Sequence, residues 1–165
     1  MANVFEPEFD GGQERPGFTY RRAKLGAQAG AKRLGASLYE LPPGQAAFPY
    51  HFHTANEELL VVLSGRPHLR DPDGWRQLEA GEIVACPSDE HGAHQLHNRS
   101  DEVVRVLVVS EMNAPDVVFQ PDSGKFLAGD RPPGGRKEDG RLFATFRLED
   151  EVDYWEGEDP PSEKA

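Results

Sequence analysis

The chain has 165 residues and a mass of 18.3 kDa, which is enough for one domain with a buried core. Its formal net charge of −11 repels phosphate backbones, so we do not expect it to bind nucleic acid. No apolar run approaches the ~20 residues that cross a bilayer, and the start MANVFEPEFDGG does not resemble a secretory signal. The single cysteine, Cys86, excludes an internal disulfide and fits a cytoplasmic protein.

The sequence predicts an N-terminal arm followed by a series of short β-strands. Residues 1–24 are polar and rich in turn formers, so we expect an extended N-terminal arm. From about residue 25 to 120 short β-branched and aliphatic pieces recur between turns rich in Gly, Pro, Asn, Asp and Ser. These pieces are ASLYEL, FPYHFH, EELLVVLSG, RPHLRDPDG, WRQLEAGE, IVACPSDEHG, AHQLHNRSDE, VVRVLVVSE and NAPDVVFQ.

Short strands without interposed helices predict an all-β protein, a closed antiparallel sandwich or barrel. Residues 121–157 are expected to add C-terminal strands and a Gly/Pro loop, LAGDRPPGGRKEDGR. The stretch LFATFRLEDEVDYWEG is expected to pack Phe143, Phe146 and Trp155 on the barrel. Residues 158–165 read as a flexible acidic tail.

Histidines and carboxylates gather on two of the predicted strands. Side chains alternate between the faces of a strand, so His51 and His53 share one face, and EELLVVLSG can bring a glutamate beside them. On a later strand His94 shares a face with Leu96, whereas His97 takes the opposite face. Neutral imidazole with carboxylate suits one divalent transition metal, namely Fe, Mn, Ni, Cu or Zn. An open coordination position would let that ion polarise a substrate or bind dioxygen.

Two segments carry a family resemblance. GQAAFPYHFHTANEELLVVLSG resembles the first motif of the cupin superfamily: a glycine, HxH, a glutamate and a second glycine. GEIVACPSDEHGAHQLHN resembles the second motif, with Gly81, Pro87, a histidine and then Asn98. The middle of this second segment is longer than the common pattern. The likeness to small bacterial single-domain cupins extends over most of the chain from about residue 25.

The resemblance implies a double-stranded β-helix, the jelly-roll barrel of cupins, and it implies that His51, His53, Glu58 and His94 are the metal ligands. It also implies a homodimer, because small cupins commonly pair through arms or edge strands. The motifs do not select a reaction, since one cupin barrel hosts many chemistries.

Neighbouring residues compete for these roles. The spacing to Gly65 favours Glu58 over Glu57, which is then a surface charge or a hydrogen-bond partner of a ligand histidine. Glu57, Tyr50 and His91 are also candidates for a general base or for the substrate pocket, and nothing in the sequence selects among them.

The resulting hypothesis is a mononuclear metalloenzyme that acts on a small polar molecule, such as a sugar derivative, a carboxylate or an aromatic compound. It would be a dioxygenase or a sugar or sugar-phosphate isomerase. The alternative is a non-catalytic module in which the metal is structural or holds a ligand. A phosphate site would need convergent Arg or Lys, and the sequence shows no clear cluster, since Arg66, Arg70 and Arg105 occupy strand positions expected to face outward.

Overall fold

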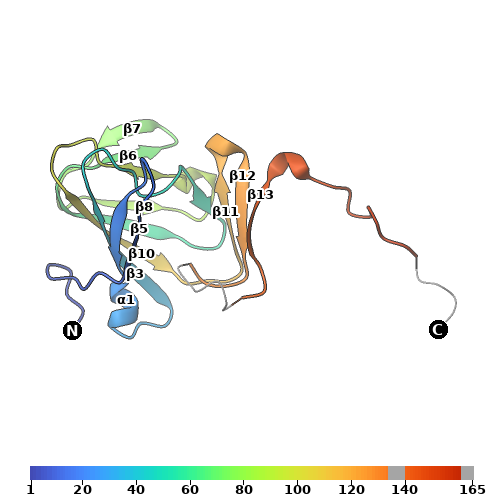
Figure 1. Cartoon of the computed structure of the whole chain (residues 1–165), viewed down its shortest axis with the longest axis horizontal. Helices are drawn as coiled ribbons and strands as arrows, with labels where there is room; N and C mark the ends of the chain where they lie inside the picture. Colours follow the sequence, from blue (N-terminus) through green and yellow to red (C-terminus); the bar gives the residue numbers. More distant parts are fainter. Residues whose placement is uncertain (134–139, 161–165) are drawn as a thin grey trace.

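The computed structural model describes residues 1–133 and 140–160 and shows an all-β barrel with an extension at its C-terminal end (Figure 1). The predicted Gly/Pro loop and acidic tail fall partly on 134–139 and 161–165, which lie outside the described residues. The strands are β1 (Gly11–Gln13), β2 (Tyr20–Ala23), β3 (Leu34–Leu41), β4 (Phe52–His53), β5 (Glu58–Ser64), β6 (His68–Asp71), β7 (Gly74–Gln77), β8 (Ile83–Cys86), β9 (Gln95–His97), β10 (Val104–Glu111), β11 (Asp116–Gln120), β12 (Lys125–Gly129) and β13 (Phe143–Arg147). The helical turns are α1 (Leu25–Gln28), η1 (Glu90–Gly92), η2 (Pro121–Ser123) and η4 (Leu148–Asp150).

Three antiparallel sheets build the barrel wall. The largest has the order β1-β2-β3-β10-β5-β8, a second has the order β13-β12-β11-β4, and a third has the order β7-β6-β9. In the largest sheet β10 lies between β3 and β5, and Val106 pairs with Val62 across it. The expected all-β class is therefore confirmed.

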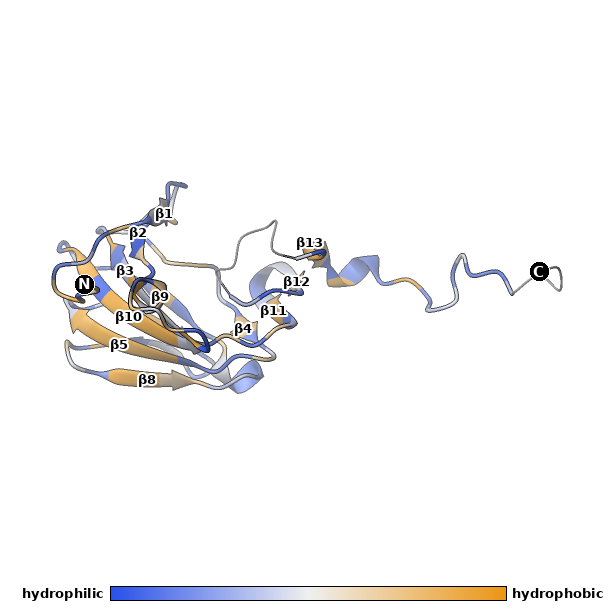
Figure 2. Ribbon diagram, turned by 90° about the horizontal axis from the view of Figure 1, so that it is seen from below, coloured by the Kyte–Doolittle hydropathy of each residue, from blue (hydrophilic) through white to orange (hydrophobic). Residues whose placement is uncertain are grey.

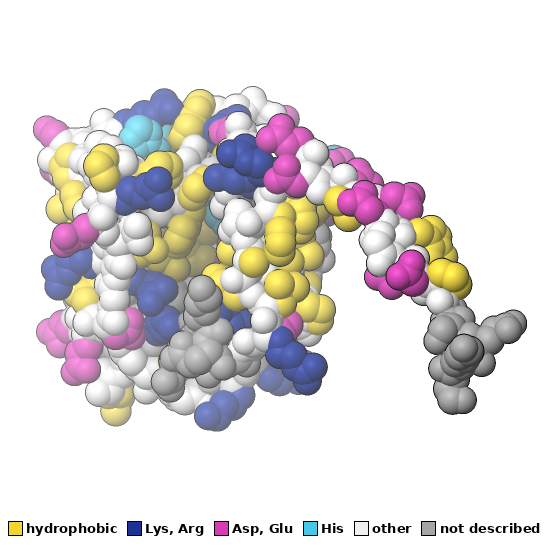
Figure 3. All heavy atoms as spheres, turned by 45° about the vertical axis from the view of Figure 1, so that its right-hand side comes forward, with side chains coloured by type: hydrophobic (Ala, Val, Ile, Leu, Met, Phe, Trp, Pro, Cys, Tyr) yellow, Lys and Arg dark blue, Asp and Glu magenta, His cyan; other side chains and the backbone are white. Residues whose placement is uncertain are grey.

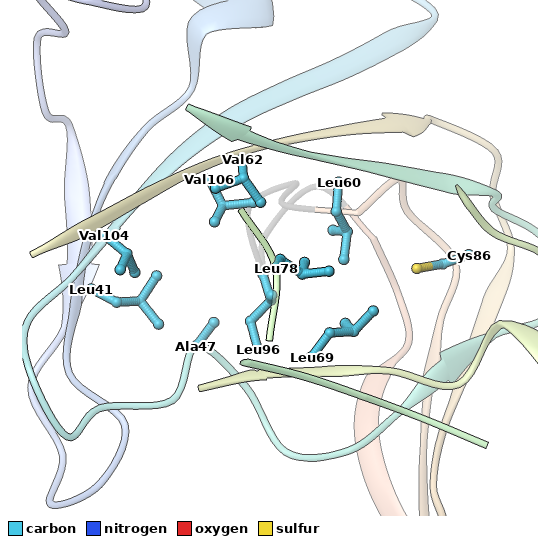
Figure 4. Close-up of a cluster of buried hydrophobic side chains, with 10 residues drawn as sticks. All are labelled: Leu41, Ala47, Leu60, Val62, Leu69, Leu78, Cys86, Leu96, Val104 and Val106. Carbon is cyan, nitrogen blue, oxygen red and sulfur yellow. The ribbon is translucent and has the colours of Figure 1, made fainter. Parts of the chain in front are cut away.

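The core lies between the largest sheet and the three-stranded sheet (Figure 4). Leu60 and Val62 of β5 are 1% exposed, whereas the preceding Leu59 is 38% exposed and Val61 between them is only half-buried. This alternation along β5 is the one expected from its sequence. The buried members of the core are Leu41, Ala47, Leu60, Val62, Leu69, Leu78, Cys86, Leu96, Val104 and Val106.

The N-terminal residues lie against the outer side of the largest sheet. β2 pairs with β3, and β1 pairs with β2, so the arm extends that sheet. Ala23, Leu25 and Leu38 form a second apolar cluster, and residues nearer the N-terminus pack against it. The domain boundaries expected at 24 and 120 stay predictions.

The chain adds its last strand, β13, to the four-stranded sheet and then leaves the barrel (Figures 1 and 2). Phe146 of β13 stacks on Phe126 of β12, with ring centroids 5.4 Å apart. Trp155, however, is 71% exposed and contacts Tyr154, so the expectation that it packs on the barrel is wrong. The chain has turned outward at η4, before it reaches this residue. Among the described residues no helix is long and apolar enough to span a membrane.

Candidate metal centre

His51 and His94 are held side by side by the backbone. The amide of His51 donates to the carbonyl of His94 at 3.1 Å, and the amide of His94 donates to the carbonyl of His51 at 2.8 Å. Two residues that exchange both hydrogen bonds are direct partners in an antiparallel ladder, so their side chains lie on the same face. Their imidazole centroids are 4.6 Å apart.

His53 is placed by the second sheet. It ends β4 and pairs with Val118 of β11, and its ring centroid lies 5.4 Å from that of His51. Its Nδ1 donates to the Asp116 carboxylate at 2.5 Å. The other Asp116 oxygen accepts from the backbone amides of Thr54 and Ala55 at 3.3 and 3.1 Å. Asp116 therefore fixes both the ring and the turn that follows it.

Glu58 enters from the largest sheet as the first residue of β5, two positions before buried Leu60. Its Oε2 lies 3.3 Å from Nε2 of His94 and 3.9 Å from Nε2 of His53. One ligand atom from each of His51, His53 and Glu58 lies within 4.8 Å of the others. The structure thus brings together the three histidines and the glutamate that the sequence singled out.

All three imidazoles have the same tautomer. Nδ1 of His51 lies 2.8 Å from the Pro49 carbonyl, and Nδ1 of His94 lies 2.9 Å from the Gly92 carbonyl. A carbonyl or a carboxylate can only accept, so each Nδ1, including that of His53, carries the proton. Each ring, in its neutral form, therefore has its lone pair on Nε2, which is the arrangement that metal-binding histidines adopt.

The cluster is electrostatically coupled. Burial, together with the smaller effects of the neighbouring His94 and His53, lowers the pKa of His51 to about 3. Burial also opposes charge on His94, but hydrogen bonds with Cys86 and Glu58 outweigh it and raise its pKa to about 10. The same His94 contact lowers the pKa of Glu58 despite its burial. In the metal-free protein a proton on His94 supplies the positive charge that Glu58 requires.

The remaining sequence candidates lie elsewhere. Glu57 is exposed, and the exposed His91 in η1 lines a separate surface pocket together with Tyr50. Tyr50 also carries the guanidinium of Arg70 over its ring at 4.1 Å. None of these three side chains lines the cavity beside the histidines. His97 faces away from His94, as expected from strand parity, and its ring contacts Trp75.

A cavity of about 290 Å³ opens beside the four candidate ligands. Its walls combine Tyr39 of β3 and Val108 of β10 with Val118 of β11 and Leu127 of β12, so it lies between the largest sheet and the four-stranded sheet. Figure 3 shows a hollow between the barrel and the C-terminal strands, with apolar side chains on its floor. Most of the wall is apolar, and a few polar groups converge on it, as in sites for small molecules.

Two features of this site were missed by sequence reasoning. Asp116 was not considered, although an acidic residue at the start of the apolar strand DVVFQ was a usable signal. Arg22 and Arg131 line the cavity, whereas no arginine cluster was expected. The three arginines that were considered do face outward: Arg66, Arg70 and Arg105 pair with Glu79, Asp122 and Glu40 respectively.

Comparison with known proteins agrees with this geometry. The family model for the cupin domain matches residues 37–110. These residues therefore form a cupin domain. The match extends from β3 to β10 and so includes all four candidate metal ligands. No curated protein sequence matches the chain.

Several solved structures share the fold. A protein from Acidithiobacillus ferrooxidans, proposed to be a sugar phosphate isomerase, is 27% identical with a TM-score of 0.71, over 83% of this chain and 81% of that one. A cupin-superfamily sugar phosphate isomerase from Silicibacter pomeroyi is 24% identical with a TM-score of 0.76, over 91% and 94% of the two chains. The polyketide cyclase RemF from Streptomyces resistomycificus is 21% identical with a TM-score of 0.55, over 83% and 87%.

The residues of this cupin fit a metal ion. Three imidazoles that can bind through Nε2, that of His94 after it loses its second proton, and one carboxylate form a donor set that suits divalent first-row transition metals. The hydrogen bonds on the three Nδ1 atoms are those that orient such ligands. The chemistry of the donor set, and not only the family, therefore supports a metal at this position.

Proposed function

We propose that the protein is a metal-dependent enzyme acting on a small polar molecule that binds in the 290 Å³ cavity. His51, His53 and His94, through Nε2, and Glu58, through its carboxylate, would hold one divalent transition metal. The observation that carries the proposal is the common tautomer of the three imidazoles, because three separate acceptors hold their Nδ1 protons away from one shared point.

A divalent ion at this position would supply Lewis-acid polarisation of a substrate oxygen. The residues of the chain provide the rest of the environment. The apolar wall of Leu60, Val108 and Val118 excludes water around the reacting groups. Burial raises the pKa of Tyr39, so its phenol stays protonated at the cavity wall and can donate a hydrogen bond to a substrate oxygen.

Isomerisation is the reaction class we favour. The Acidithiobacillus ferrooxidans protein, which matches over most of both chains, carries a proposed sugar phosphate isomerase activity. Two arginines also line the cavity, so the sequence-based objection that a phosphate site lacks convergent cations no longer applies.

Metal analysis of protein purified without chelators tests the proposal. We expect about one divalent metal per chain in the wild type and a sharp loss in His51→Ala and His94→Ala. The control is His97→Ala, which removes an imidazole only three positions away but on the opposite face, and it should keep the metal. An equal loss in all three variants, or a wild type that binds no more metal than His94→Ala, would disprove the metal centre.

Turnover separates an enzyme from a binding module. Wild-type protein loaded with Fe, Mn, Ni or Zn should convert a small sugar phosphate to its isomer, and the metal-free protein should not. A compound that binds to every metal form and is recovered unchanged would instead indicate a non-catalytic module. Oxygen uptake by the Fe form would move the assignment to a dioxygenase.

A further inference from the structure

The cavity beside the candidate metal centre is lined by two arginines whose buried guanidinium nitrogens have no hydrogen-bond partner in the described part of the chain. Arg131 is 6% exposed, and its Nε and Nη1 are buried without a hydrogen bond to any described residue. Nε of Arg22 is in the same condition. Buried polar atoms are almost always hydrogen-bonded, and an unpaired buried charge is costly. Two such groups in one cavity require an explanation.

The two arginines reach the cavity from different sheets. Arg22 lies on β2 and pairs with Tyr39 of β3, in the largest sheet. Arg131 lies two residues after Gly129, the residue of β12 that pairs with Asp116 in the four-stranded sheet. Both side chains line the cavity that the candidate metal ligands also line. A molecule in this cavity can therefore contact the metal ligands and both guanidinium groups.

Each guanidinium group is held in place without losing its hydrogen-bonding capacity. The central carbon of the Arg131 guanidinium lies over the ring of Phe143, 3.6 Å from the ring centroid. Stacking of this kind occupies the face of the group and leaves its N–H edge free. Arg22 is covered by β1, because a Cβ on Gly11 would lie 2.9 Å from Nη2 of Arg22. The donors are thus fixed before a ligand arrives, which lowers the entropic cost of binding.

Within residues 1–133 and 140–160, no carboxylate forms an ion pair with either of these two cations. The carboxylates that line the cavity are Glu58 and Asp116, and both are engaged with histidines. Other arginines of the barrel have acidic partners: Arg21 and Arg105 both contact Glu40. In a chain with 29 acidic and 18 basic residues, an unpaired cation pair facing a cavity indicates that the counter-charge comes from a ligand.

We propose that Arg22 and Arg131 form a binding site for a phosphate group, so that the ligand of the cavity is a small phosphate monoester. A phosphate dianion neutralises two guanidinium groups and offers each of them two acceptor oxygens in the fork geometry that arginine recognises. This assignment rests on the proposed function in that it names the substrate class for the same cavity. The site itself requires no metal, since it consists of residues outside the candidate ligand set.

The test therefore uses metal-free protein. Chelator-dialysed wild type is titrated with inorganic phosphate at pH 8 by calorimetry, and the Nε–H resonances of arginine are followed by ¹⁵N NMR. We expect saturable binding and selective shifts of the Arg22 and Arg131 resonances. Arg131→Gln and Arg22→Gln should each weaken phosphate binding at least about tenfold, as expected for loss of a charge-assisted contact. Acetate, a monoanion, should bind at least about tenfold more weakly than phosphate does.

Matched controls come from neighbouring arginines. Arg21→Gln alters the exposed residue next to Arg22, and Arg141→Gln alters an exposed residue two positions before β13. Neither should change phosphate affinity. Removing an unpaired buried charge should leave the melting temperature of Arg131→Gln equal to or above that of the wild type. Should that variant not fold, Arg22→Gln and the wild-type resonances decide the question.

Several results would overturn the proposal. They are phosphate binding that needs the metal, equal losses in the control variants, acetate binding as tightly as phosphate, or unshifted Arg22 and Arg131 resonances. The proposed metal centre is tested independently of the phosphate site. If wild-type protein binds no metal but the two arginines still bind phosphate, the phosphate site survives and the metalloenzyme proposal fails. If metal binds but phosphate does not, the reverse holds.

Discussion

Replacing Asp116 by Asn is the sharpest test of how the candidate centre is oriented. Asp116 is 5% exposed, and its two carboxylate oxygens have separate tasks. Oδ2 accepts from Nδ1 of His53, while Oδ1 accepts from the amides of Thr54 and Ala55. Asparagine has one acceptor oxygen and one NH₂ group. If its oxygen stays with the two amides, its NH₂ group faces Nδ1 of His53.

That contact is repulsive unless the His53 proton moves from Nδ1 to Nε2. A proton on Nε2 removes the lone pair that the metal requires. Loss of a carboxylate behind a metal-binding histidine typically costs about 10- to 100-fold in metal affinity. This range corresponds to about 1.4–2.8 kcal/mol of binding free energy. We expect Asp116→Asn to weaken metal binding by this amount and to leave the far-UV circular dichroism spectrum unchanged.

The assay is competition for Zn²⁺ or Co²⁺ against a chromophoric chelator, at a fixed pH and ionic strength. The control is Glu57→Gln, which removes an exposed carboxylate next to the candidate ligand Glu58. Its affinity should match that of the wild type. The reasoning is refuted if Asp116→Asn binds metal as tightly as the wild type, or if Glu57→Gln loses as much affinity as Asp116→Asn does.

Two further predictions follow from the same geometry. The pKa of His94 is raised from 6.5 to about 10, so in the metal-free protein its proton contributes stability that is complete below pH 6.5 and lost as the pH rises through 10. Metal uptake must displace this proton, so metal affinity should rise about tenfold per pH unit from about pH 7 to 9, and proton release should be detectable in weak buffer. A metal affinity that does not change with pH above 7.5 would contradict the His94–Glu58 coupling. A Cβ on Gly92 would lie 1.9 Å from the Pro87 carbonyl oxygen, so Gly92→Ala should displace the backbone at this position. The Gly92 carbonyl, which accepts from Nδ1 of His94, would move with it. We expect the free energy of unfolding, measured by urea titration, to fall by about 1–3 kcal/mol. His91→Ala, at an exposed position of the same loop, should change neither stability nor metal affinity, and equal stability of the two variants would show that the loop accommodates the methyl group.

The sequence could predict on which face of its strand each candidate side chain lies. Alternation placed His51 and His53 on one face, and it placed Glu58 with the inward Leu60 and Val62. It also separated His94 from His97, which the structure places on opposite sides of their strand. These statements need only the twofold period of a strand, because one buried face fixes the phase for every residue on it.

Contacts between strands that are distant in the sequence were beyond the same reasoning. Asp116 lies 63 positions from His53, and nothing in strand periodicity says which strand of a barrel will lie against β4. Arg131 follows a strand end, where no alternation applies. Arg22 lies in a segment interpreted as an arm, although β2 pairs with β3 within the largest sheet. In each case the position depends on strand order, which is a property of the closed barrel and not of the local sequence.

The apolar core adjoins the candidate site, and Ala47, Leu60 and Leu96 belong to both. We expect burial of the apolar core around Leu60, Val106 and Leu96 to stabilise the barrel without a metal, in contrast to small metal-nucleated domains. The closed barrel then forces three imidazoles and Glu58 together, and the proton on His94 balances the buried carboxylate. A divalent ion entering this site exchanges one positive charge for two. The rigid barrel therefore holds the ligands in place before the ion arrives, and the cost of assembling them is met by the core and not by the metal.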